Sequence, residues 1–253
     1  MLNALIKSKT LNKVSKQLDN LRMITSTGEN FPVELINAVG EILPLTNIIP
    51  MYGLTECKRV SIMPHDRKDK IQAGSCGLPL PDTSVRLDDN GELIISGANV
   101  MAGYWNDPQT TEQYFFNDPD FGWSLRSGDL FRIDSDGFLY FNGRLKQIMK
   151  IDGIRISAFE IEVRLKKFLG EGTDVKIISI KDEFHGEKII ACVASQILPF
   201  DKVRDILTAA SASEPAYRKI SGLVWLKIMP LNANGKINVP LLVKTAEEKY
   251  VHI

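Results

Sequence analysis

Residues 143–162 read GRLKQIMKIDGIRISAFEIE and carry two local signals side by side. The segment 150–156 predicts a tight hairpin, in which Gly153 lets the backbone approach closely. Ser157 and Glu160 then form a capping box, which predicts that an amphipathic helix begins there. We expect this helix to bury Ile161, Leu165 and Phe168 and to end at Gly170.

The sequence after this helix indicates a compact α+β unit. Apolar runs predict strands at residues 175–180, 189–194 and 223–228. Helices are expected over residues 201–210 and from Pro240 onward, because proline suits the first turn of a helix. The pattern changes near Lys146, so we predict that residues 146–253 form a separate α+β domain.

The sequence before this stretch changes character once more. Residues 85–87 with 92–96, and 131–133 with 138–141, flank Asp- and Gly-containing turns that predict two hairpins. Asp107-Pro108 between them predicts the capped start of a short helix. We expect residues 59–145 to form a small, mostly antiparallel β-barrel or sandwich.

Residues 1–58 alternate helical and strand signals, as in an α/β layer. Apolar residues share one helical face between positions 2 and 18, and strands are expected at 21–24 and 47–50. Pro32 opens the helix between these strands, with Leu35, Ile36, Val39 and Ile42 expected to be buried. The predicted fold class is therefore α/β and α+β. A large domain over residues 1–145 consists of an α/β remnant and the β-rich subdomain.

Composition excludes several classes of function. Lys plus Arg and Asp plus Glu both total 31 of the 253 residues, so no net field favours nucleic acid. The three cysteines and three histidines show no metal-ligand spacing. The odd number of cysteines favours reduced thiols over disulfides. Lysines interrupt the apolar residues near the N-terminus, so we expect no signal peptide and no membrane span. A cytoplasmic protein is the simplest expectation.

Three short motifs carry groups suited to binding a nucleotide. Tyr52-Gly-Leu-Thr-Glu56 follows a strand, and offers a planar ring, a hydroxyl and the hard carboxylate oxygen that Mg²⁺ prefers. Asp129 can accept two hydrogen bonds from a vicinal diol, although Ser-Gly-Asp is also a common turn. Lys236 follows Asn234-Gly235, a hairpin-turn dipeptide, and supplies a long, flexible cation.

In their order along the chain, these motifs resemble those of the AMP-forming adenylating enzymes. That superfamily includes acyl-CoA synthetases, peptide-synthetase adenylation domains and luciferases, and the resemblance covers its C-terminal half only. The resemblance implies that Tyr52 with Gly53, Thr55 and Glu56 contact adenine, the α-phosphate and Mg²⁺. It also implies that Gly28-Glu29 form the adenine-side turn, although a plain strand-to-helix loop is an equal alternative.

The remaining roles come from the same resemblance. Asp129 and Arg144 correspond to the residues that hold the ribose and a phosphate, and Lys146 corresponds to the hinge between the two domains. The resemblance also implies that the domain over residues 146–253 is mobile. The loop around Gly153 corresponds to the one that approaches the pantetheine thiol. Lys236 corresponds to the adenylation lysine, which would bridge the attacking carboxylate and the α-phosphate.

The implied function is ATP-dependent ligation of a carboxylic acid to a thiol through an acyl-adenylate, with ATP or AMP, Mg²⁺ and coenzyme A as cofactors. The phosphate-gripping loop of the family, expected before Tyr52, is absent from these 253 residues. We therefore expect that the chain alone does not catalyse adenylation, and that it associates with an N-terminal fragment or with itself. Two alternatives stay open: a non-catalytic AMP- or CoA-binding module or split-enzyme subunit, and an adenylation unit that loads a carrier-protein phosphopantetheine in trans. The residues here do not identify the acid.

Overall fold

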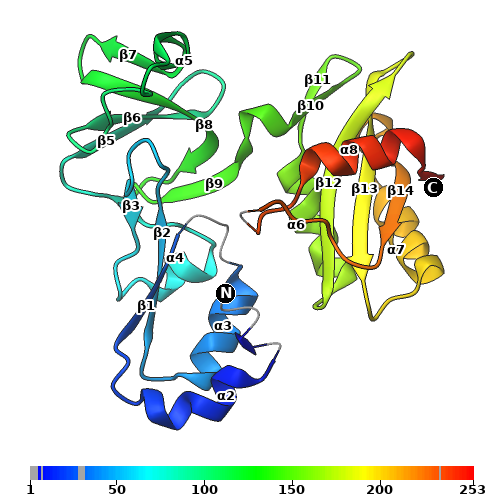
Figure 1. The fold of residues 1–253 in the computed structure, drawn as a ribbon, viewed down its shortest axis with the longest axis horizontal. Coiled ribbons are helices and arrows are strands. Elements are labelled where there is room, and N and C mark those ends of the chain that lie inside the picture. The colour runs from blue at the N-terminus through cyan, green and yellow to red at the C-terminus, as the bar shows by residue number, and fades with distance from the viewer. Residues whose placement is uncertain (1–4, 7, 28–31, 234) are drawn as a thin grey trace. The chain divides into compact units, whose positions relative to one another are not determined.

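The computed structural model describes residues 5–6, 8–27, 32–233 and 235–253 and divides the chain into two compact units (Figure 1). The N-terminal unit spans Met1–Phe141 and the C-terminal unit spans Asn142–Ile253. Each unit is described by itself below. The assignment of the second unit to a mobile domain stays a prediction. None of the described helices is long and apolar enough to cross a membrane.

The first sheet of the N-terminal unit has the strand order β1-β2-β3-β4. Its strands are β1 (Met23–Ser26), β2 (Asn47–Tyr52), β3 (Ser61–Ile62) and β4 (Leu78–Pro79). Strands β1 and β2 are parallel, and the other pairs are antiparallel. The helices of this layer are α2 (Thr10–Val14), η1 (Ser15–Leu18), α3 (Val33–Ile42) and α4 (Lys68–Gln72).

Helix α3 and strand β2 supply much of the core of this layer. Ile36 and Val39 of α3 lie in one apolar cluster with Ile48 and Met51 of β2, because residues three apart on a helix share a face. Leu35 and Ile42, which were expected to be buried with them, are only partly buried.

The single helix predicted from the N-terminal periodicity is wrong within the described residues. Lys9 adopts a left-handed conformation (φ 55°) directly before α2, and the chain continues after Val14 as the 3₁₀ helix η1. A left-handed residue cannot continue a right-handed helix, so the helix cannot run through Lys9. The spacing of apolar residues carries no information on the backbone conformation of a lysine between them.

The second sheet of the N-terminal unit contains β5 (Thr83–Leu87), β6 (Glu92–Gly97), β7 (Phe115–Asp118), β8 (Gly122–Ile133) and the start of β9 (Leu139–Arg144), which continues into the C-terminal unit from Asn142. Both predicted hairpins are confirmed, as β5–β6 and β8–β9. The strand order is β5-β6-β8-β7, and β9 also pairs with β8. The predicted barrel is not confirmed. Strands β5 and β7 lie at opposite ends of the strand order and do not pair with each other, so the sheet is open. Helix α5 (Pro108–Tyr114) precedes β7 and is capped by Asp107, as predicted.

The C-terminal unit is built on an antiparallel hairpin, β12 (Thr173–Asp182) and β13 (Gly186–Ser195). Strand β14 (Ile220–Leu226) pairs parallel with β13, and β15 (Val251–His252) pairs antiparallel with β14. The helices are α6 (Ala158–Leu169), α7 (Phe200–Ala212) and α8 (Val239–Glu248), with short 3₁₀ turns η2 (Leu145–Gln147) and η3 (Ala216–Arg218). A small hairpin, β10 (Ile148–Ile151) and β11 (Ile154–Ser157), precedes α6.

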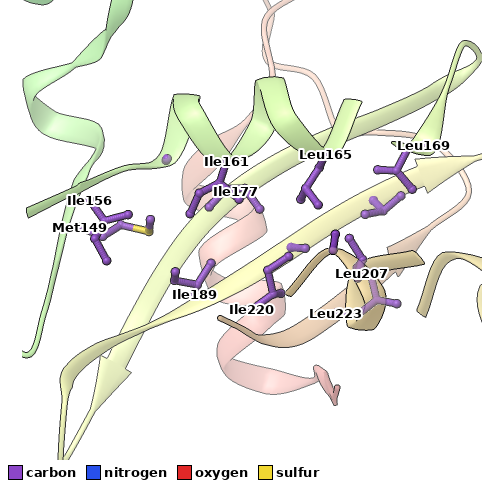
Figure 2. Close-up of a cluster of buried hydrophobic side chains, with 14 of the residues drawn as sticks. Met149, Ile156, Ile161, Leu165, Leu169, Ile177, Ile189, Leu207, Ile220 and Leu223 are labelled. Atoms are coloured by element: carbon purple, nitrogen blue, oxygen red, sulfur yellow. The ribbon is translucent and has the colours of Figure 1, made fainter. Parts of the chain in front are cut away.

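Side chains alternate between two apolar clusters along this sheet. Ile177 and Ile189 pack with α6 and α7, whereas Ile178 and Ile190 pack with α8. The two helical layers therefore cover opposite faces of the sheet, because successive strand residues point to opposite sides. Figure 2 shows the first cluster, with Ile161 and Leu165 of α6 facing Ile177 and Ile189.

The predicted start and end of α6 are confirmed, but one of its predicted core residues is wrong. The Ser157 side chain accepts a hydrogen bond from the Glu160 N–H, and Gly170 terminates the helix with φ 72°. Phe168 is 58% exposed, and Leu169 is buried instead. The buried stripe is centred on Ala158, Ile161, Leu165 and Leu169, which follow one ridge of the helix, and Phe168 lies to the side of it.

Candidate functional site

The loop after β2 is shaped by a close approach of its own backbone. A Cβ atom at Gly53 would lie 1.6 Å from the Lys58 carbonyl oxygen, so no other residue fits there without moving the loop. Lys58 itself has a left-handed φ of 48°, and Val60 N–H donates to the Tyr52 carbonyl at 2.9 Å. The backbone that approaches Gly53 so closely belongs to the same loop.

A neighbouring segment holds this loop from outside. Met101 N–H donates to the Glu56 carbonyl at 2.8 Å. The Asn99 Nδ2 group donates to the carbonyls of Cys57 (3.3 Å) and Arg59 (2.7 Å). Backbone carbonyls of a loop need such partners when water does not reach them. These contacts fix the main chain that carries Tyr52 and Glu56.

Tyr52 and Asp129 form the central polar pair of the N-terminal unit. The Tyr52 hydroxyl donates to Asp129 Oδ2 at 2.8 Å, and Asp129 is only 3% exposed. Burial and the neighbouring Asp129 charge raise the pKa of Tyr52 far above its usual range, so this hydroxyl remains a donor at every ordinary pH. The Phe131 ring packs edge-on against Tyr52, with ring centroids 4.6 Å apart.

The turn before Asp129 is held by side chains rather than by helix or sheet alone. Gly128 has φ 70°, and its N–H donates to Glu92 Oε1 at 2.8 Å. The Ser127 hydroxyl accepts from the Asp129 N–H at 3.1 Å. A carboxylate fixed in this way presents its oxygens in a constant direction, which is what binding a vicinal diol requires.

Glu56 is the second carboxylate of this region. Its Oε1 accepts a hydrogen bond from the Tyr104 hydroxyl at 2.6 Å, and its side chain is only partly buried. Burial and the bond to Glu56 raise the pKa of Tyr104 above its usual range, so the tyrosine donates. Thr55, one residue earlier, is exposed. Tyr104 could not be predicted from the sequence, because its partner lies 48 positions away and no local pattern links the two.

Cys57 in the same loop does not have the properties of a nucleophile. Burial raises its pKa to about 11, so the thiol stays protonated at neutral pH. Cys76 and Cys192 are also free thiols, and burial raises the pKa of each to about 12. Acyl transfer through a cysteine of this chain is therefore not favoured.

Among the described residues, no three His, Cys, Asp or Glu side chains gather closely enough to hold a metal ion. Glu56 can therefore supply one carboxylate ligand but not a complete metal cage. Mg²⁺ fits that arrangement, because it keeps several waters and is bound through one or two carboxylates plus substrate phosphates.

The C-terminal unit carries the other predicted site residues. Arg144 ends β9, and Lys146 lies in η2; both are exposed. Gly143 before them has φ 124°, and a Cβ there would lie 3.0 Å from Ser157 Oγ and 3.2 Å from Phe159 Cβ. The chain therefore enters the C-terminal unit through a turn that a larger residue would strain.

Gly153 forms the tip of the predicted hairpin, which the structure confirms as β10–β11. Asp152 (φ 50°) and Gly153 (φ 79°) both have positive φ, as a two-residue hairpin turn requires. The Asp152 N–H donates to the His185 carbonyl at 3.1 Å, and Asp152 Oδ1 lies 2.7 Å from His185 Nδ1. The tip is thereby attached to the turn between β12 and β13.

Lys236 lies on an exposed turn of the C-terminal unit. Its N–H donates to Asn232 Oδ1 at 3.0 Å, and its carbonyl accepts from the Asn232 N–H at 2.7 Å. A bridge between Leu231 and Ile237 closes the turn. The structure thus brings Tyr52 and Asp129 into contact and carries Glu56 on the same loop as Tyr52, whereas Arg144, Lys146, Gly153 and Lys236 occupy separate elements of the other unit. Gly28 and Glu29 lie outside the described residues.

Comparison with known proteins shows to which protein family this chain belongs. The family described as AMP-binding enzyme matches residues 1–105. The chain is also 30% identical over 243 residues to 4-coumarate–CoA ligase-like 4 of Oryza sativa subsp. japonica, covering 92% of this chain and 43% of that protein. The chain belongs to the AMP-forming adenylating enzyme superfamily.

Other members of the superfamily match over a similar extent. The chain is 32% identical over 243 residues to bacitracin synthase 3 of Bacillus licheniformis, covering 90% of this chain and 4% of that protein. The fold matches o-succinylbenzoate CoA synthetase from Bacillus subtilis, solved with its acyl-adenylate intermediate. The TM-score is 0.75 at 20% identity, over 100% of this chain and 55% of that one. The chain spans about half the length of the CoA ligases that it matches.

Proposed function

We propose that this chain is the C-terminal half of an AMP-forming acid–thiol ligase of the acyl-CoA synthetase type. The observation that carries the proposal is the Tyr52–Asp129 pair, with Glu56 on the same loop, in a chain related to CoA ligases. The reaction converts a carboxylic acid and ATP into an acyl-adenylate and pyrophosphate. A thiol then displaces AMP to give the thioester.

The N-terminal unit would bind the nucleotide. The Tyr52 ring is suited to stacking on adenine, and the buried Asp129 carboxylate to accepting the two ribose hydroxyls. Thr55 offers an exposed hydroxyl for the α-phosphate. Glu56 would supply one ligand to Mg²⁺, which neutralises phosphate charge when bound. Tyr104 donates to Oε1, and among the residues that the structure describes no side chain donates to the other oxygen of Glu56, which leaves that oxygen for the metal.

The C-terminal unit would supply the mobile groups of the two half-reactions. Lys236, on its exposed turn, is a cation for the attacking carboxylate and the α-phosphate. Arg144 would contact ribose or phosphate, and Lys146 would act as the hinge. The hairpin tip at Gly153 would approach the thiol of coenzyme A. These residue roles follow from the superfamily resemblance.

A specific observation favours one second candidate. Bacitracin synthase 3, a peptide synthetase by name, is 32% identical to this chain. An adenylation unit that loads the phosphopantetheine of a carrier protein uses the same first half-reaction. The two candidates therefore differ only in the thiol acceptor. A module that binds AMP or coenzyme A without catalysis is the remaining alternative.

Because the chain spans about half of its relatives, we propose that adenylation requires residues corresponding to their other half. The test measures acid-dependent ATP–pyrophosphate exchange by the chain alone and after addition of such an N-terminal half. We expect no exchange alone and restored exchange in the mixture. Exchange by the isolated chain would contradict the requirement for the other half.

Nucleotide binding can be tested on this chain directly, by calorimetric titration with AMP. We expect AMP to bind and Asp129→Ala to abolish measurable binding, because the ribose loses its buried acceptor. Asp120→Ala, at an exposed aspartate in the turn between β7 and β8, is the control and should bind normally. Failure of the unsubstituted chain to bind AMP would overturn the proposed nucleotide site.

A further inference from the structure

Glu56 is attached at two points to one short segment, residues 101–104. Its backbone carbonyl accepts from the Met101 N–H at 2.8 Å. Its side chain accepts from the Tyr104 hydroxyl at 2.6 Å. A residue held by both its main chain and its side chain loses most of its rotational freedom. The direction of the Glu56 carboxylate is therefore set by a segment that the superfamily roles described above leave unused.

Tyr104 is itself held firmly. Its backbone N–H donates to Thr111 Oγ1 at 2.9 Å, and the Thr111 hydroxyl donates to the Asp107 carbonyl at 2.8 Å. Asp107 in turn caps helix α5. The short helix thus anchors the backbone of Tyr104 through a threonine in its first turns.

The ring of Tyr104 is packed as well as its backbone. The ring meets Phe115 edge-on, with centroids 5.8 Å apart, and Tyr114 at 6.5 Å. Gly103, which precedes it, has φ 146°, and a Cβ there would lie 2.6 Å from Thr111 Cγ2. Glycine is therefore required for the chain to turn into Tyr104. These contacts hold the hydroxyl where it meets Glu56.

We infer that Tyr104 is a positioning residue that fixes the Glu56 carboxylate, so that its second oxygen would serve as a ligand for the Mg²⁺ that accompanies ATP. The Tyr104 hydroxyl occupies Oε1, and in the described part of the chain no hydrogen bond to Oε2 is recorded. A hydrogen bond from a neutral hydroxyl to a carboxylate is short and roughly twice as strong as one between neutral groups. Partners of metal-binding carboxylates typically contribute 10–100-fold to metal affinity or activity. The inference rests on the proposed function, since it assigns Tyr104 to the same nucleotide site.

The experiment compares two affinities of this chain, measured by titration calorimetry. AMP is titrated in the presence of a chelator, and ATP is titrated with and without excess Mg²⁺. We expect Tyr104→Phe to leave the AMP affinity within about twofold, because Asp129 and Tyr52 are untouched. The gain in ATP affinity on adding Mg²⁺ should shrink by about 10-fold or more.

Two further variants separate positioning from a general loss of structure. Tyr114→Phe removes a hydroxyl from the ring that packs against Tyr104, and should keep the full Mg²⁺ effect. In a Glu56→Gln background, Tyr104→Phe should cause no additional loss, because the tyrosine acts only through the carboxylate. Should Tyr104→Phe not fold, Thr111→Val loosens the Tyr104 backbone instead and is expected to reduce the Mg²⁺ effect in the same direction.

Each outcome has a definite reading. An unchanged Mg²⁺ effect in Tyr104→Phe, with normal AMP binding, would overturn the inference and leave the proposed nucleotide site standing. Equal additional losses in the Glu56→Gln background would also overturn it, because Tyr104 would then act by another route. If the unsubstituted chain bound neither AMP nor ATP, the proposed function would fail, and the inference would fall with it.

Discussion

The Tyr52 hydroxyl lies 2.8 Å from Asp129 Oδ2 and donates to it across 77 positions of sequence. This bond joins the end of β2 to the second sheet of the same unit. It also means that one oxygen of the expected ribose-binding carboxylate already has a donor. Tyr52 is therefore both a candidate stacking surface for adenine and a support for the group beside it.

Removing the Tyr52 hydroxyl should destabilise the N-terminal unit. In Tyr52→Phe the buried Asp129 loses a donor, and leaving such a group short of a partner costs about 1–3 kcal/mol. Urea denaturation of the wild type, Tyr52→Phe, Asp129→Asn and the double variant gives the interaction free energy directly. Strictly additive effects of the two single substitutions would show that the bond contributes nothing.

Replacing Gly53 with alanine should destabilise the N-terminal unit strongly, although the substitution adds only one methyl group. The Cβ of Gly53→Ala would lie 1.6 Å from the Lys58 carbonyl oxygen, so the loop must move, and we expect a loss of at least about 1–3 kcal/mol. Gly40→Ala is the matched control, because nothing lies within 4 Å of a Cβ at that position of α3. There alanine should stabilise the helix by about 0.5–1 kcal/mol. Thermal unfolding of both variants checks the opposite signs.

The Lys70–Asp134 pair predicts acid sensitivity of the N-terminal unit. The Lys70 ammonium lies 2.7 Å from Asp134 Oδ2, and this hydrogen bond holds the pKa of the carboxyl well below its usual range. A depressed pKa means that the stabilisation is complete above the unfolded value of about 3.9 and is lost as the pH falls through the folded value. Lys70→Met should shift this loss to higher pH. Unfolding measured from pH 5 downward tests it, and superimposable pH profiles would contradict it.

The Asp152–His185 pair predicts the opposite pH dependence at the hairpin tip. The hydrogen bond to Asp152 raises the pKa of His185 above its usual range. The contact is therefore fully present below about pH 6.5, the unfolded value, and is lost as the pH rises through the folded one. Asp152→Asn should lower the pKa of His185, as followed by NMR titration of its ring. An unchanged His185 titration would argue against the pair.

Local sequence signals predicted much of the fold because their causes are local. The Asp107 and Ser157 caps, the Gly170 helix end, and the turns of the β5–β6, β8–β9 and β10–β11 hairpins each depend on a few adjacent residues. Errors occurred where packing selects among local options. Periodicity alone did not separate Phe168 from Leu169, and it did not reveal the left-handed Lys9.

The candidate site divides along the same line. Short motifs named Tyr52, Glu56 and Asp129 as polar groups of the right chemistry. Together with the stretch 143–162 and Lys236, these motifs indicated the superfamily. The two tyrosine–carboxylate hydrogen bonds were not predictable, because their partners are 77 and 48 positions apart and many other side chains and backbone carbonyls of the chain can accept a hydrogen bond from a tyrosine hydroxyl. Only the pairing of strands and the burial around them brings these groups within hydrogen-bonding distance. The sequence by itself determines which polar side chains are available. The tertiary structure decides which of them become hydrogen-bond partners, because a polar group that is buried when the sheets assemble must find its partner within the protein.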